Sequence, residues 1–62
     1  MRVLSASEVA TKTSMSVSHV RRMVREDKFP KPFALTENRQ GWLEQDVDEW
    51  ISERVRSFRI HS

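Results

Sequence analysis

Two closely spaced prolines, Pro30 and Pro32, place the strongest constraint on how this 62-residue chain can fold. A proline has no backbone N–H to donate within a helix, and it forces the residue before it out of the α-helical region. A helix in the preceding segment therefore has to end by about Asp27 or Lys28. The apolar residues follow a helical period before the prolines and a strand-like period directly after them.

The segment before the prolines predicts an amphipathic helix over residues 16–27. Ser16 is a favourable N-cap, and the apolar residues recur at spacings of three and four: Val17, Val20, Met23 and Val24. The opposite face is polar and cationic: Ser18, His19, Arg21, Arg22 and Arg25. At about 100° per residue, Arg22 lies roughly 160° from Val20. This pattern is typical of a helix that packs on a domain by one side and presents the other to an anionic groove.

A shorter helix is predicted upstream, over residues 6–13. Ser5 and Glu8 have the spacing of a capping box, in which each side chain bonds the backbone N–H of the other residue. Ser14 and Met15 then form a turn before the next N-cap. Two short helices separated by about three residues indicate a helix-turn-helix.

After the prolines, residues 32–42 predict a small β-hairpin, or wing. Phe33 and Leu35 alternate with smaller residues, as in a half-buried strand. Gly41 is the only glycine, and Trp42 leads the chain back toward the core. The predicted wing tip carries Thr36, Asn38, Arg39 and Gln40.

The last part of the chain predicts a third helix with a clear apolar period: Val47, Trp50, Ile51, Val55 and Phe58. Acidic residues fill its first turns, where they match the positive end of the helix dipole. Both tryptophans are predicted core anchors, with base stacking as the alternative. Residues 57–62 mix apolar and polar side chains, so we expect this tail either to fray or to contact a partner.

These elements predict a mainly α fold with a small β-hairpin, a winged helix-turn-helix, as one domain over residues 1–62. The chain has no cysteine and no run of eighteen apolar residues, which argues against disulfides, thiolate metal sites and a membrane span. The N-terminus does not resemble a signal peptide, so we expect a cytoplasmic protein. Because no nucleophile–base or metal-ligand constellation is present, we expect no enzyme activity, no metal and no cofactor.

Charge is distributed unevenly along the chain. Residues 1–39 hold eight Lys or Arg against four Asp or Glu, whereas residues 40–62 hold three against five. A basic first part followed by an acidic last part indicates that one surface faces a polyanion while another does not. A mixed, solvated surface is the alternative explanation.

The chain from Leu4 to about Arg54 resembles the AlpA family of small phage-type regulators, which is related to excisionases and to the DNA-binding domains of MerR-type regulators. The matching features are Glu8-Val9-Ala10, Ser16, the block from Phe29 to Pro32, Trp42, and Asp46-Val47 with Trp50. The chain departs from the family at four positions. Ser14 and Asp27 stand where glycine is common, Arg21 replaces a tyrosine and His19 replaces a threonine.

The resemblance implies a double-stranded DNA-binding protein that regulates transcription, or a directionality factor that acts with an integrase during excision. Further copies of the chain on adjacent sites are expected partners, and the protein would be associated with the nucleoid. The outward face of the second helix differs from that of the family, so the DNA sequence preference of the family cannot be assigned to this chain. A small protein-interaction module without DNA binding is the alternative, and RNA binding is disfavoured for want of a base-stacking sheet.

In this hypothesis the 16–27 helix enters the major groove and the 36–41 wing enters the minor groove. We expect Ser18, His19 and Arg22 to contact bases, and Arg21 and Arg25 to be shared between bases and backbone. Ser16 would cap its helix and also touch a phosphate. Backbone and wing contacts are expected from Lys28, Lys31, Thr36, Asn38, Arg39 and Gln40. The alternative is a solvated arginine face with ion pairs to Glu26 or Asp27.

Overall fold

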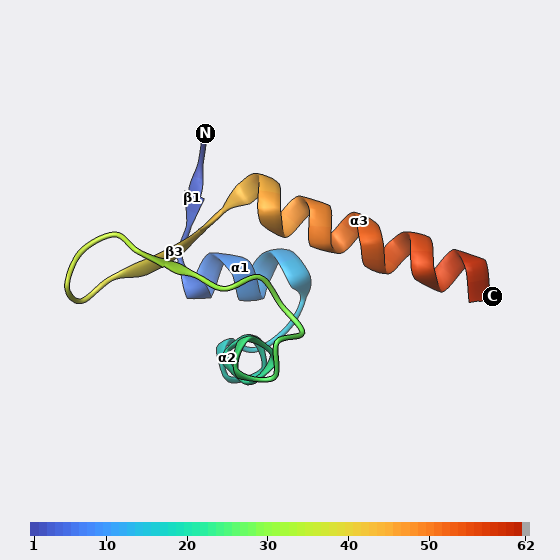
Figure 1. Cartoon of the computed structure of the whole chain (residues 1–62), viewed down its shortest axis with the longest axis horizontal. Coiled ribbons are helices and arrows are strands. Elements are labelled where there is room, and N and C mark those ends of the chain that lie inside the picture. The colour runs from blue at the N-terminus through green and yellow to red at the C-terminus, as the bar shows by residue number, and fades with distance from the viewer. Residues whose placement is uncertain (62) are drawn as a thin grey trace.

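A computed structural model describes residues 1–61, and the side chains of residues 1–59 (Figure 1). The elements follow in the order β1 (Val3–Leu4), α1 (Ala6–Thr13), α2 (Val17–Arg25), β2 (Phe33–Ala34), β3 (Gln40–Leu43) and α3 (Glu44–His61). Three helices and a small antiparallel sheet make a winged helix-turn-helix, as the sequence predicted.

Both helices of the helix-turn-helix begin at the predicted caps. Ser5 accepts a hydrogen bond from the Glu8 backbone N–H at 3.2 Å, and the Glu8 carboxylate accepts one from the Ser5 N–H at 2.9 Å. Ser16 Oγ accepts from the His19 N–H at 3.1 Å. These side chains satisfy backbone donors that lack a partner within the helix, which fixes the two starting points.

The helix end before the prolines differs from the prediction, because α2 stops at Arg25 rather than at Asp27 or Lys28. Asp27 has a left-handed backbone with φ of 57°. Its N–H donates to the Val24 carbonyl at 3.2 Å, while the Lys28 N–H donates to the Met23 carbonyl at 2.8 Å. This pair of bonds is a Schellman motif, which ends the helix before the prolines are reached.

The end of α1 repeats the same motif. Ser14 is left-handed with φ of 60°, and its N–H donates to the Thr11 carbonyl at 3.3 Å. The Met15 N–H donates to the Ala10 carbonyl at 2.9 Å. The two left-handed residues are the two that stand where the resembled family commonly has glycine, so the backbone conformation is kept without the residue that favours it.

The sheet has three strands in the order β1-β3-β2, one more than the predicted hairpin. The unpredicted strand, β1, pairs Val3 with Leu43 and Leu4 with Trp42. It is only two residues long, which is too short to show an alternating pattern in the sequence. The face of β3 that carries Gly41 is crowded, because a Cβ there would lie 2.6 Å from Val3 Cγ1.

Seven residues form the buried core: Leu4, Val9, Ala10, Val20, Phe29, Trp42 and Val47. Trp42 belongs to this core, and Trp50 is partly buried against it. Both tryptophans anchor the loop between α2 and β2. Trp42 Nε1 donates to the Pro30 carbonyl at 2.7 Å, and Trp50 Nε1 donates to the Lys28 carbonyl at 3.0 Å. The Phe29 ring packs edge-on against the Trp50 ring at 4.8 Å between centroids. The proline-containing loop is therefore held by aromatic packing and indole hydrogen bonds.

The last helix extends past this core. Figure 1 shows α3 extending beyond α1 and α2, at the end of the molecule opposite to the wing tip. All side chains of residues 52–59 are exposed, and we call residues 52–61 the α3 overhang. Residues 57–62 were expected to fray or to contact a partner. The structure instead continues α3 through His61, so the tail is helical up to that residue. Its last residue, Ser62, lies outside the described part of the chain.

Candidate nucleic-acid interface

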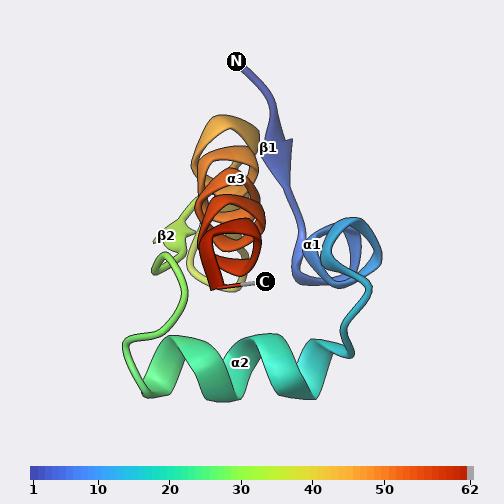
Figure 2. The same ribbon diagram turned by 90° about the vertical axis from the view of Figure 1, so that its right-hand side faces the viewer.

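The predicted reading helix lies across one end of the molecule. Figure 2 shows α2 along the lower edge, with α1, the sheet and α3 all on its other side. Val20 of this helix is fully buried against the domain, and Val17, Met23 and Val24 on the same side of the helix pack against the core. All twelve predicted contact residues are exposed: Ser16, Ser18, His19, Arg21, Arg22, Arg25, Lys28, Lys31, Thr36, Asn38, Arg39 and Gln40.

The three arginines of α2 have no acidic partner among the described residues. The carboxylates beside the end of the helix are occupied by lysines instead. Glu26 lies 3.8 Å from Lys28 Nζ, and Asp27 lies 3.3 Å from Lys31 Nζ. The alternative of an arginine face paired with Glu26 or Asp27 is thus not what the structure has. The guanidinium groups of α2 keep their charge and hydrogen-bond donors available to a partner.

A groove connects α2 to the wing. It has a volume of about 800 Å³ and collects five of the twelve predicted contact residues, namely Arg21, Arg25, Asn38, Arg39 and Gln40. Its apolar floor includes Val24 and Trp42, and Ala6 at the start of α1 also lines it. The remaining seven predicted residues lie outside this groove: Ser16, Ser18, His19, Arg22, Lys28, Lys31 and Thr36.

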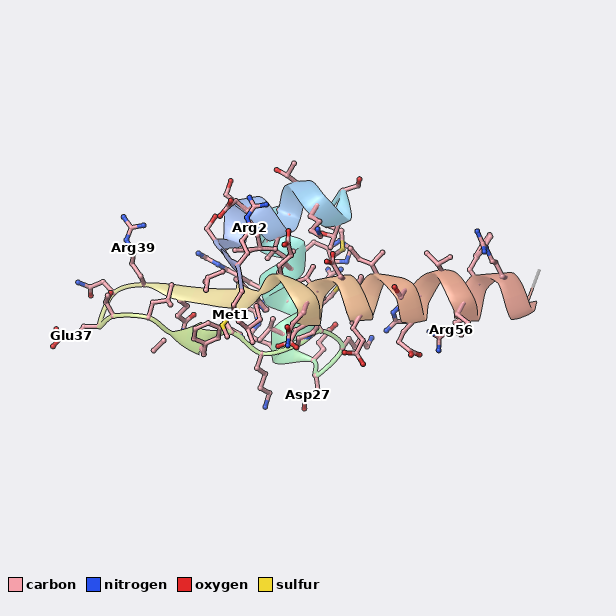
Figure 3. The ribbon with its side chains drawn as sticks, turned by 90° about the horizontal axis from the view of Figure 1, so that it is seen from above. Met1, Arg2, Asp27, Glu37, Arg39 and Arg56 are labelled. Atoms are coloured by element: carbon pink, nitrogen blue, oxygen red, sulfur yellow. The ribbon has the colours of Figure 1, made fainter. Side chains whose placement is uncertain are left out.

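The wing tip is shaped by the chain itself. The Arg39 carbonyl accepts from the Leu35 N–H at 2.8 Å and from the Thr36 N–H at 3.3 Å. The Asn38 N–H donates to Thr36 Oγ1 at 3.3 Å. Thr36 therefore has a structural role in the turn, because its hydroxyl satisfies a backbone donor. Figure 3 shows Arg39 near the wing tip and pointing to the side on which α1 lies.

One acidic side chain was missed by the sequence reasoning. Glu37 lines the same groove as Arg21, Arg25 and Arg39, and Figure 3 shows it at the outer end of the wing. The sequence analysis did not single out Glu37, since nothing in the pattern indicated that the wing tip and α2 line one groove. The residue introduces one negative charge into an otherwise cationic groove.

A set of ion pairs connects the segment beside β1 to α1 and α3. Arg2 contacts Glu8 at 3.3 Å and Glu44 at 3.4 Å. Hydrogen bonds from Ser5, with help from Arg2, lower the pKa of Glu8 below its ordinary value. Lys12 Nζ lies 2.8 Å from Asp48, and this contact raises the lysine pKa. Two carboxylates at the start of α3, Glu44 and Asp48, thus pair with cations of the chain. No metal-binding cluster of His, Cys, Asp or Glu occurs within the described residues.

Comparison with known proteins identifies a family for this arrangement. The family model described as prophage CP4-57 regulatory protein (AlpA) matches residues 2–55, which cover every element before α3 and the first 12 of the 18 residues of α3. No curated protein and no solved structure shows significant similarity to the chain. None of the helices described here is long and apolar enough to cross a membrane. The family is regulatory rather than enzymatic. The chain belongs to the AlpA family of prophage regulatory proteins.

Proposed function

We propose that this protein is a sequence-specific regulator that binds double-stranded DNA, inserting α2 into the major groove and residues 36–41 of the wing into the adjacent minor groove. One observation supports this most strongly: the groove that joins Arg21 and Arg25 of α2 to Arg39 of the wing. The α2 arginines have no acidic partner among the described residues, and a polyanion supplies one. Family membership supports a phage-type regulatory role.

Within this proposal the exposed residues of α2 divide into two groups. Ser18, His19 and Arg22 lie outside the groove, on the outward side of α2, and contact base edges. An arginine bonded to guanine O6 and N7 discriminates by about 1–3 kcal/mol. Arg21 and Arg25 line the groove toward the wing, where they contact the backbone between the major and minor grooves.

The lysines contribute less than the arginines, because each already has a carboxylate neighbour. Lys31 and Asp27 are both about three-quarters exposed, and such exposed ion pairs contribute little. Phosphate can replace the carboxylate, but the gain is reduced by the ion pair that is lost. With about five phosphate contacts, log affinity falls with log salt at a slope of roughly −4 to −5.

Footprinting on the DNA that flanks the protein's own coding region tests the proposal. Protection at two salt concentrations, lost in Arg22→Ala, is the expected result. Arg56→Ala is the matched control, because this arginine lies on α3, pairs with Glu53 at 3.1 Å and is far from the wing (Figure 3). Absence of protection on any duplex would overturn DNA binding and favour a protein-interaction module.

The location of the footprint separates the two regulatory tasks. Protection beside an integrase site within an attachment sequence indicates excision, with the integrase and further copies of this chain as partners on the DNA. Protection confined to a promoter indicates control of transcription. Either task places the protein at the nucleoid.

A further inference from the structure

We propose that Glu37 makes the wing selective for a guanine·cytosine pair, by accepting a hydrogen bond from the guanine amino group in the minor groove. This inference rests on the proposed function and adds to it the base pair that the wing recognises. Glu37 is exposed and lines the groove that also contains Arg21, Arg25 and Arg39. Its carboxylate is the only acidic group that lines this groove within the described chain.

The backbone of the wing tip determines where Glu37 lies. The Arg39 carbonyl accepts hydrogen bonds from the N–H groups of Leu35 and Thr36, at 2.8 and 3.3 Å, and these bonds close the turn. The Asn38 N–H donates to Thr36 Oγ1 at 3.3 Å. Glu37 therefore lies at the apex of a turn that its neighbours fix, and Figure 3 shows it at the outer end of the wing. When the wing enters the minor groove, this side chain enters with its tip.

The Glu37 carboxylate has no partner of its own in the described chain. Neither a hydrogen bond nor an ion pair joins its side chain to another described residue, although three arginines line the same groove. Figure 3 shows Glu37 and Arg39 pointing in different directions from the wing tip. An exposed carboxylate without such a bond does not hold the turn together, so its acceptor oxygens are available to a ligand.

The minor groove of DNA offers few groups that a carboxylate can bind. An ionised carboxylate only accepts hydrogen bonds. An adenine·thymine pair presents only acceptors in the minor groove, adenine N3 and thymine O2, whereas a guanine·cytosine pair adds one donor, the guanine N2 amino group. The Glu37 carboxylate is therefore repelled by the first kind of pair and bonded by the second.

Arg39 has the opposite preference, which makes the two side chains complementary. A guanidinium group only donates hydrogen bonds, and narrow A·T-rich minor grooves attract it. Glu37 and Arg39 are the only charged residues among residues 36–41, so their charges cancel and the tip adds little general attraction to DNA. The wing therefore contributes selectivity for a guanine·cytosine pair beside a narrow A·T segment.

Inosine substitution tests this contact. Inosine pairs with cytosine but lacks the N2 amino group, and it leaves O6 and N7 of the major-groove edge unchanged. The probe is the fluorescein-labelled duplex that the footprint identifies, with its guanines replaced by inosine one position at a time. Fluorescence anisotropy of the wild type should find a guanine whose replacement weakens binding roughly tenfold. In Glu37→Gln the same replacement should weaken binding less than about twofold, since an amide both donates and accepts.

A variant with the same change of charge elsewhere is the matched control. Glu49→Gln removes one carboxylate from α3, outside the groove, and should keep the roughly tenfold discrimination of the wild type. Glu37→Gln should also bind the inosine-substituted duplex several-fold more tightly than the wild type does at low salt, because no carboxylate then faces the acceptors of the minor groove. Circular dichroism of both variants establishes that the domain is still folded.

Two outcomes would overturn this inference while leaving DNA binding intact. In the first, the wild type tolerates every inosine replacement, as it would if Glu37 accepted from cytosine N4 in the major groove, a group that inosine leaves in place. In the second, Glu37→Gln loses as much affinity as the wild type at the same position, as it would if Glu37 acted only on the shape of the turn. Absence of binding to every duplex is a different result, which would overturn the proposed function and this inference with it.

Discussion

The two longest helices, α2 and α3, are both amphipathic, but α2 leaves charged side chains without a partner and α3 leaves apolar side chains exposed. In α2 the apolar stripe is covered by the domain, with Val20 fully buried, while its arginines have no acidic partner in the described chain. In the second half of α3 the charges are engaged, whereas Val55 and Phe58 are exposed. Arg54 stacks on the Trp50 ring at 5.1 Å, and Arg56 pairs with Glu53 at 3.1 Å. The polyanion that we propose as the partner of α2 would meet unpaired charge, whereas the second half of α3 offers an apolar surface.

The sharpest way to break this comparison is a matched pair of valine-to-alanine substitutions. Val20 is 0% exposed and Val55 is 44% exposed. Val20→Ala removes two buried methyl groups and should cost about 2–3 kcal/mol of unfolding free energy. Val55→Ala should cost less than about 0.5 kcal/mol in the monomer. Urea denaturation of both variants at low protein concentration measures the contrast, and equal losses would mean that the α3 overhang also packs within its own domain.

The second test concerns the cations. Arg22→Ala should weaken binding to the cognate duplex by about 1–3 kcal/mol and relax the preference at one base position. Lys31→Ala should weaken binding by less than about 1 kcal/mol, because Lys31 also loses its pair with Asp27 at 3.3 Å. Fluorescence anisotropy with cognate and mutated duplexes gives both values. A larger loss for Lys31 than for Arg22 would reverse the assignment of base-reading and backbone contacts.

Local sequence signals predicted the elements that local interactions control. The caps Ser5 and Ser16 gave both helix starts, and the two tryptophans gave the core anchors. β1 was missed because two residues hold no period and pair only through β3, a partner about 40 residues away in the sequence. The end of α2 was placed two or three residues late, because the left-handed Asp27 ends the helix before Pro30 can do so.

At the candidate site the sequence predicted which residues are exposed but not how they are grouped. Periodicity alone placed the arginines on the outer face of α2. Two features depend on how the chain folds after the prolines: the groove between α2 and the wing, with Glu37 in it, and the pairing of Lys28 and Lys31 with acids. The loop that the tryptophans anchor sets the distances between these side chains, so residue types alone do not predict them.

The third test addresses the turns at either end of α2. Ser14 and Asp27 both hold left-handed backbones that glycine adopts without a steric penalty. Ser14→Gly should raise the unfolding free energy by about 0.5–1 kcal/mol, the net of relieved strain and the added flexibility of the unfolded chain. Asp27→Gly should give a smaller increase, since aspartate tolerates this region better than serine. Thermal denaturation of the two variants measures the order, and a destabilised Ser14→Gly would contradict the strain argument.

The smallest expected effect is on the pH dependence of stability. It concerns Glu8, whose charge has partners within the chain, in contrast to the α2 arginines. The folded pKa of Glu8 is lowered, first by the hydrogen bond from the Ser5 backbone. A lowered pKa stabilises the fold above the unfolded value of about 4.3, and this contribution is lost as pH falls through the folded pKa. Glu8→Gln should therefore be less stable than the wild type at pH 7, with the difference shrinking as the pH is lowered through 4. Arg22→Ala, measured in parallel by thermal denaturation, should show no such pH dependence, because its guanidinium contacts no acidic group in the described chain. A constant difference for Glu8→Gln across this range would mean that the capping hydrogen bonds, rather than the ionised carboxylate, stabilise α1.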